Sequence, residues 1–175
     1  CGISDRLRLD LVLNDFVASA LINNKIEILS DGSPMRPLIN VRDMCRAFDW
    51  GISRDKDAGG QTIICNAGSN SWNYSVKELA LSVQEHFNHC NVNINKDAPP
   101  DKRSYKVDFS LFDKLAGSSY TPLMSLDETI NDLIKGLKLI GFSDKNFRKS
   151  NLMRLNVLNN LRNSQFLNKS LYWKT

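Results

Sequence analysis

The sequence is poor in the residues that build most metal sites and disulfide scaffolds. It contains two histidines and four cysteines among its 175 residues. The cysteines lie far apart and form no C-x-x-C pair, so neither a zinc site nor a disulfide framework is predicted. We therefore expect reduced, partly buried thiols in a cytoplasmic protein.

Long apolar runs are also missing. No stretch of 18 apolar residues occurs in the chain, whereas a helix that spans a bilayer needs about 20. No membrane partner is therefore expected. The chain starts with Cys1 rather than methionine, so we expect it to begin inside a longer polypeptide, and it offers no signal peptide to read.

A glycine-rich turn of the kind that holds a dinucleotide is missing as well. Neither G-x-G-x-x-G nor G-x-x-G-x-x-G occurs anywhere in the sequence. Such a turn lets the backbone approach a pyrophosphate at the N-terminus of a helix. The sequence therefore predicts no NAD site on this chain.

Charge of either sign is nearly balanced. The formal net charge is +4 at pH 7, and the basic residues are densest between Lys145 and Lys174. This small excess suits a cleft for a diphosphate and equally a solvated surface. It does not by itself imply a nucleic-acid partner.

What is present is an ordinary globular composition, with 42% hydrophobic and 24% charged residues. The length favours one domain with its own core. Capping boxes at Ser75 with Glu78 and at Ser125 with Glu128 open two helices, and Asp10 is expected to cap an earlier one. Periodicity predicts helices at 10–23, 43–52, 75–87, 111–116, 125–140 and 148–165, and strands at 25–29, 36–41, 62–66, 91–95 and 104–108.

The most informative stretch runs from Glu27 to Asp43 and reads EILSDGSPMRPLINVRD. It predicts a short strand, a tight turn at Asp31 and Gly32, a second strand that begins with Arg36, and a helix capped by Asp43. An arginine at the start of a strand has a fixed base and a planar fork of donors that matches phosphate oxygens. The alternative is a surface arginine paired with a neighbouring acid.

This stretch resembles part of the C-terminal half of the extended short-chain dehydrogenase/reductases, the NAD-dependent sugar-nucleotide epimerases and dehydratases. That family carries a segment of the form GDG-x-x-x-R followed by I-x-V-x-D, and here Ser30 replaces its first glycine. The resemblance covers roughly residues 1–140. Further segments match the family in the same order, namely Cys65–Ser69, Ser75–Ala80, Arg103–Asp108 and Ser125–Ile130.

The resemblance implies two arginine contacts to a nucleotide-diphosphate sugar. Arg36 would hold the diphosphate. Arg103, which follows the Pro-Pro-Asp-Lys loop of residues 99–102, would reach the phosphates or the ribose. The prolines restrict the loop backbone, which makes the position of the next side chain predictable.

Three further candidates lie on or near the first predicted helix. Arg8 and Asn14 belong to the segment R-x-D-L-V-x-N-D-F, which resembles a subset of these enzymes in which the helix start faces the substrate. For Asn14 the alternative is an exposed helix amide. Leu11, together with Leu29 of the first strand, is a candidate for an apolar wall against the nucleobase, and core packing is the alternative for both leucines.

The family's catalytic Tyr-x-x-x-Lys is absent, because none of Tyr74, Tyr105 and Tyr120 has a lysine four positions later. The predicted fold is α/β, the mixed C-terminal substrate-binding lobe of an extended Rossmann-type enzyme without its N-terminal dinucleotide-binding half. NAD would be bound by that missing half, and this chain alone should be inactive. We divide it into a substrate-binding lobe, residues 1–143, and a helical extension packed on it, residues 144–175.

Two other functions remain open. One is a non-catalytic relative that keeps the cleft as a sugar-nucleotide-binding or protein-interaction module. The other is a nucleic-acid or interaction domain that uses the basic residues of the helix predicted at 148–165, although this helix has no docking motif and a solvated face explains its charges. No nucleic-acid partner is therefore expected, and a homo-oligomer is compatible with the sequence.

Overall fold

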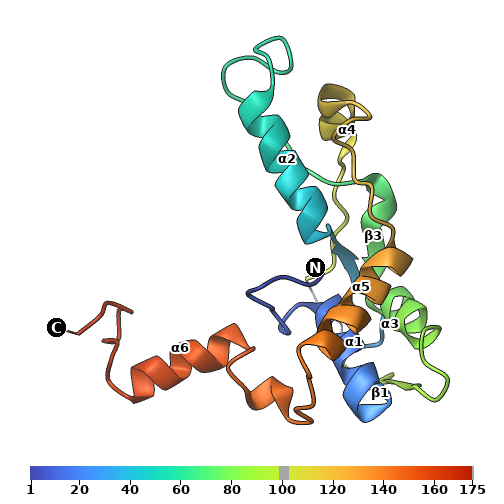
Figure 1. Cartoon of the computed structure of the whole chain (residues 1–175), viewed down its shortest axis with the longest axis vertical. Coiled ribbons are helices and arrows are strands. Elements are labelled where there is room, and N and C mark those ends of the chain that lie inside the picture. The colour runs from blue at the N-terminus through green and yellow to red at the C-terminus, as the bar shows by residue number, and fades with distance from the viewer. Residues whose placement is uncertain (99–102, 175) are drawn as a thin grey trace.

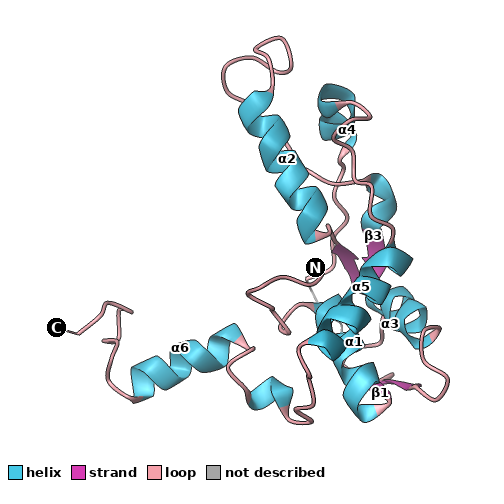
Figure 2. Cartoon of the chain, viewed as in Figure 1, coloured by secondary structure: helices cyan, strands magenta, loops and turns pink. Residues whose placement is uncertain are grey.

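The computed structural model describes residues 1–98 and 103–174. Within these ranges the chain forms six α-helices, four short strands and two 3-10 turns. Figure 2 shows that helices make up most of this regular structure. Each of these helices is too short or too polar to cross a membrane. The elements are α1 Val12–Asn23, β1 Lys25–Ile28, β2 Met35–Pro37, α2 Val41–Ser53, η1 Asn70–Trp72, β3 Asn73–Ser75, α3 Val76–Gln84, β4 Asn91–Ile94, α4 Ser110–Ala116, α5 Leu126–Leu139, η2 Phe147–Lys149 and α6 Arg154–Asn163.

The main body is built around α1. Apolar residues occupy most of this helix, and Leu13, Phe16 and Val17 are buried because α3, α5 and β1 pack around it (Figure 1). The same core takes Ile26 and Ile28 from β1, Leu79 and Val83 from α3, and Ile130, Leu133 and Leu137 from α5. The predicted α/β class is confirmed.

The strands form two separate two-stranded sheets. β1 pairs in parallel with β4, so that Lys25 lies opposite Asn91. β2 pairs antiparallel with β3, and Arg36 lies opposite Tyr74. The two strands predicted on either side of the tight turn therefore exist, but they do not pair with each other, and the second is shorter than predicted because it ends at Pro37.

The turn between β1 and β2 requires its glycine. Gly32 has a φ of +84°, and a Cβ at this position would lie 2.9 Å from the Cβ of Lys77. The carbonyl of Gly32 accepts a hydrogen bond from the Lys77 N–H at 2.9 Å. The Asp31 carboxylate accepts another from the Ser33 N–H at 3.0 Å. The turn is thereby tied to the first turn of α3.

An arm made of α2 and α4 rises from the main body (Figure 1). Its small core contains Trp50 and Phe112, whose rings meet edge to face at 5.2 Å. The strands predicted at 62–66 and 104–108 were wrong, because both segments are irregular. Ile64 is 93% exposed. Apolar β-formers predicted strands there, but in the described part of the chain neither segment has a neighbouring strand to pair with.

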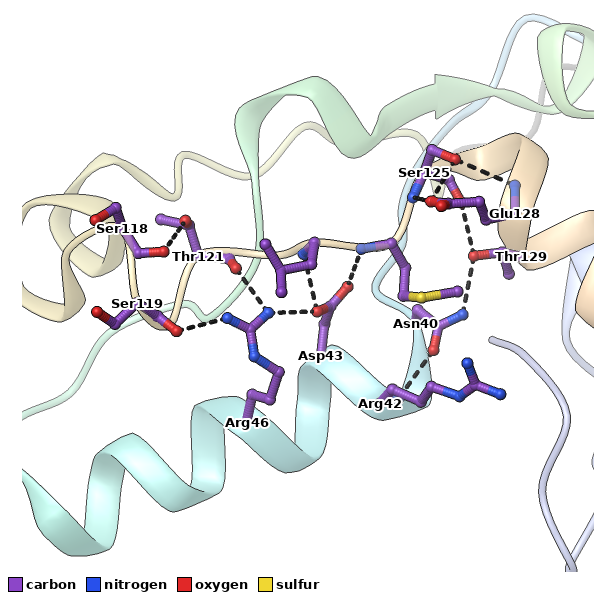
Figure 3. A network of polar contacts seen from close by, with 12 residues as sticks. Asn40, Arg42, Asp43, Arg46, Ser118, Ser119, Thr121, Ser125, Glu128 and Thr129 are labelled. Atoms are coloured by element: carbon purple, nitrogen blue, oxygen red, sulfur yellow. Dashed lines mark hydrogen bonds and ion pairs between the residues drawn. The ribbon is translucent and has the colours of Figure 1, made fainter.

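A polar network joins this arm to the main body (Figure 3). The buried carboxylate of Asp43 accepts hydrogen bonds from the backbone N–H groups of Leu123 and Met124, both at 3.0 Å. It also accepts one from Nη1 of Arg46 at 2.9 Å. Arg46 in turn donates to the carbonyl of Thr121 at 2.9 Å. The network therefore fixes the chain just before α5 against the first turn of α2.

The prediction that Asp43 caps α2 was wrong. The helix begins two residues earlier, and the side chain of Asn40 accepts the capping bond from the Arg42 N–H at 2.9 Å. Asn40 also donates to the hydroxyl of Thr129 at 2.9 Å, which links the start of α2 to α5. The two predicted capping boxes at the starts of α3 and α5 are confirmed.

The C-terminal segment meets the main body at Phe147. This side chain is fully buried and packs edge to face on Phe142, with ring centroids 5.8 Å apart. Leu152 and Met153 pack against the same core. By contrast, α6 contains no buried residue and projects away from the body (Figure 1). The contact of this segment with the body is thus concentrated in residues 147–153.

Candidate functional site

A groove of about 730 Å³ opens beside the N-terminal end of α1. Its walls come from α1, the end of β1, the first residue of α3, and the C-terminal segment. Apolar lining is supplied by Leu9, Val12, Phe16, Ile28, Leu29 and Val76. Charged lining is supplied by Asp10, Asp15, Glu27, Arg103 and Arg148. A ligand with an anionic part and an apolar face suits such a surface.

The two arginines predicted to contact a diphosphate lie together. Nη1 of Arg36 donates to the carbonyl of Arg103 and, at 2.8 Å, to the carbonyl of Met35. The N–H of Met35 also donates to the hydroxyl of Ser104 at 3.0 Å. β2 and the segment that starts at Arg103 are therefore held side by side. The proline-containing loop of residues 99–102, which we expected to orient Arg103, lies outside the described residues.

Leu29 and Leu11 have different surroundings, although the same wall was predicted for both. Leu29 follows β1 directly, lines the groove and is 84% exposed. A large apolar side chain that is so exposed at the edge of a groove is available to a ligand. Leu11 is the half-buried residue that precedes α1, and it is not among the residues that line this groove.

Asn14 is neither an exposed helix amide nor part of the groove lining. Its side chain is buried, and its Oδ1 accepts from the Gly2 N–H at 3.0 Å. Its Nδ2 donates to the carbonyl of Arg8 at 2.9 Å. The amide therefore holds the loop of residues 2–8 against α1. Asn14 could affect a ligand only through the position of this loop.

Arg8 forms a two-point ion pair with Asp10. Its Nε and Nη2 donate to the two carboxylate oxygens at 3.0 Å and 2.7 Å. This hydrogen bonding lowers the pKa of Asp10. The prediction that Asp10 caps α1 was wrong, because no side-chain hydrogen bond caps that helix. Arg8 itself faces a second hollow of about 630 Å³, between the loop of residues 5–10 and α6.

Every carboxylate in the groove lining has a cationic partner. Asp10 pairs with Arg8, Glu27 with Lys25, and Asp15 with Arg148. Paired carboxylates repel an incoming anion far less than bare ones do. Within residues 1–98 and 103–174, no three histidine, cysteine, aspartate or glutamate side chains gather as ligands for a metal ion.

Sequence reasoning missed Arg148. We assigned this residue to the solvated face of a helix predicted at 148–165, but that helix starts only at Arg154. Arg148 lies instead in the short turn η2, next to the buried Phe147. No local sequence signal distinguishes it from the other basic residues of the C-terminal segment, because its partner Asp15 is 133 residues away.

The chain matches no protein-family model. It does resemble solved structures. An NAD-dependent NDP-hexosamine 5,6-dehydratase of tunicamycin biosynthesis is 17% identical, with a TM-score of 0.63 over 79% of this chain and 43% of that protein. UDP-glucuronic acid 4-epimerase from Bacillus cereus, solved with UDP-glucuronic acid and NAD, is 19% identical, with a TM-score of 0.57 over 76% of this chain and 41% of that protein.

L-threonine dehydrogenase from Phytophthora infestans has the same architecture, at 17% identity and a TM-score of 0.57 over 71% of this chain and 40% of that enzyme. At these identities the likeness establishes the fold alone. The predicted resemblance to part of an extended short-chain dehydrogenase/reductase is confirmed at that level. The chain spans about two fifths of the length of these proteins.

Proposed function

We propose that this chain is the substrate-binding part of an NAD-dependent sugar-nucleotide epimerase or dehydratase. Three observations support this proposal. The family motifs occur in their usual order along the chain, the fold matches about two fifths of such enzymes, and Arg36 bonds to the backbone of Arg103 beside a groove. The last observation carries most of the argument, because it joins two predicted phosphate contacts that are 67 residues apart.

The role of Arg36 in this proposal is to bind the diphosphate. Its Nη1 bonds to two backbone carbonyls, so the guanidinium plane is held in one orientation. A group that is already oriented loses less conformational freedom when a ligand binds. Arg103 would contact the phosphates or ribose, and Leu29 would pack against the nucleobase. The chain thus positions the sugar for a reaction whose other groups lie elsewhere.

NAD would transiently oxidise a sugar carbon in the complete enzyme. The residues of this chain do not fit a dinucleotide. Its adjacent glycines, Gly59 and Gly60, lie in a turn after α2, and a Cβ on Gly59 would lie 2.6 Å from the side chain of Ile63. That close approach is to the chain itself, so the pair does not open a cradle for a pyrophosphate. We assign NAD to a part of the polypeptide outside this chain.

Replacing Arg36 tests the proposal. In calorimetric titration with UDP-glucose, Arg36→Ala should weaken binding by about 1.5–3 kcal/mol, the range for a hydrogen bond to a charged group. Arg36→Lys should also bind more weakly, because a point charge does not reproduce the planar fork. Arg42→Gln is the matched control, since Arg42 is a surface arginine on α2 paired with Asp132.

Unchanged affinity in Arg36→Ala would remove this residue from the site. Melting temperatures of all variants are needed beside the titrations, because Arg36 also bonds to the backbone of its own chain. A loss of binding in a variant that melts like the unchanged protein then reports a ligand contact.

A non-catalytic binding or interaction module is the second candidate. The exposed apolar residues of the C-terminal segment favour it, since Leu155 is 65% exposed and Phe166 and Trp173 are also exposed. The coding sequence upstream of Cys1 discriminates between the two functions. A glycine-rich turn and a Tyr-x-x-x-Lys there would support the enzyme, and their absence would support the module.

A further inference from the structure

Arg148 is held in a defined position by contacts on two sides. Its guanidinium lies over the ring of Phe147, with 5.0 Å between the guanidinium carbon and the ring centroid. Nε and Nη2 donate to the two oxygens of Asp15 at 2.8 Å and 2.6 Å. Nη2 also reaches the hydroxyl of Ser19 at 3.3 Å. Since Phe147 is buried in the main core, the whole turn is fixed against α1.

This arginine keeps donor capacity although it is already paired with Asp15. A guanidinium carries five N–H donors in one plane. In the part of the chain that the structure describes, Nε and Nη2 of Arg148 make hydrogen bonds and Nη1 makes none. The side chain is 42% exposed and lines the same groove as Arg103 and Leu29. A pair of N–H groups thus remains on a guanidinium that Asp15 has already oriented.

The charges around the groove favour an anion near Arg148. The lining carboxylates Asp10 and Glu27 are paired with cations of their own, so Asp15 is the carboxylate that mainly masks Arg148, and Glu27 adds a smaller effect. A diphosphate diester carries two negative charges and several acceptor oxygens. Two guanidiniums on the walls of one groove match such a ligand better than one does.

We propose that Arg148 is a ligand-binding residue of this groove and contacts the diphosphate of a nucleotide-diphosphate sugar. The inference rests on the proposed function and extends it, because it makes the C-terminal segment part of the binding site. In this arrangement Asp15 has two opposing effects. It orients the guanidinium, and it cancels part of the positive charge that the ligand meets.

Two variants that each remove one charge test the proposal, because they should change affinity in opposite directions. In titrations with UDP-glucose, Arg148→Gln should bind about tenfold more weakly, the effect of losing one charge-assisted hydrogen bond. Asp15→Asn should bind several-fold more tightly, because it unmasks the cation. The same factors should appear with UDP, which keeps the diphosphate and lacks the sugar. Arg42→Gln is again the control for losing one positive charge.

The outcomes separate this inference from the proposed function. If the unchanged protein binds neither UDP-glucose nor UDP, both the proposed function and the inference about Arg148 are wrong. If Arg36→Ala weakens binding while Arg148→Gln does not, the contact by Arg148 alone is overturned. If Arg148→Gln and Asp15→Asn weaken binding equally, the ion pair only supports the fold. An effect confined to UDP-glucose would overturn the assignment to the diphosphate.

Should Arg148→Gln melt at a much lower temperature, the double variant Asp15→Asn/Arg148→Gln provides the measurement. It removes both charges and leaves no unpaired carboxylate beside α1. The proposal expects this variant to bind about as weakly as Arg148→Gln, since the donor to the phosphate is still missing. Binding equal to that of the unchanged protein would overturn it.

Discussion

At the scale of single residues, the molecule depends on polar side chains that organise backbone far away in the sequence. Asp43 is the clearest case. Its carboxylate accepts from the N–H groups of Leu123 and Met124, 80 and 81 residues away, and from Arg46 (Figure 3). The motif that contains this aspartate resembles a family signature. In this chain the residue links α2 to the segment before α5 by hydrogen bonds.

Asp43→Asn should therefore destabilise the chain by about 2–3 kcal/mol, because the new amide presents N–H donors to N–H groups that need an acceptor. Urea unfolding followed by circular dichroism measures this change in the free energy of unfolding. Asp49→Asn on the exposed side of the same helix removes the same charge and should change stability by less than about 0.5 kcal/mol. Equal effects of both variants would contradict the role assigned to the network.

At the scale of elements, the C-terminal segment has two unlike parts. Residues 147–153 place Phe147 in the main core and Arg148 in the groove wall. α6 follows directly, yet none of its residues is buried. A ten-residue helix is marginal in water without a partner surface, so we expect the stability of the segment to come from its first part.

Phe147→Ala should destabilise the chain by about 3–5 kcal/mol, the range for removing a large aromatic side chain from a core. Leu155→Ala, at the second residue of the exposed helix α6, should cost less than about 0.5 kcal/mol. Thermal unfolding of the two variants compares them directly. A large loss in Leu155→Ala would mean that α6 packs on a surface in solution, for instance in a homo-oligomer.

At the scale of the whole molecule, the chain carries apolar surface that its own core does not cover. Phe48 and Ile52 of α2 and Ile64 of the following segment are exposed on the arm. The aligned part of this chain covers only about two fifths of the solved structures of the same fold. We propose that the rest of a longer polypeptide covers this part of the arm and supplies the NAD site.

The whole-molecule prediction is that this chain does not retain NAD. The glycine-rich turn that would hold the pyrophosphate is missing from its sequence. Equilibrium dialysis at micromolar protein should therefore show no stoichiometric binding of NAD, while UDP-glucose in a parallel cell should be retained. Tight binding of NAD would contradict the division of functions that we propose.

The features that could be predicted from the sequence alone depend on interactions between residues that are close together in the chain. The capping boxes that open α3 and α5 join residues three apart in the chain. Their pattern can therefore be recognised in the sequence without knowledge of the fold. The turn at Asp31 and Gly32 is local too, and the apolar periodicity of α1 predicted the central helix. The family resemblance added Arg36 and Arg103, and the structure brings these two residues into contact.

Interactions between distant segments decided the rest. Residues 62–66 have the composition of a strand, but a strand needs a neighbour for its hydrogen bonds, and the described part of this chain provides none there. Arg148 reads as a surface charge until the fold brings it to Asp15 across 133 residues. The sequence therefore determined most of the helices and the turn, and the resemblance added the arginine pair. Tertiary packing determined which charges share a groove, because that depends on where the buried Phe147 holds the C-terminal segment.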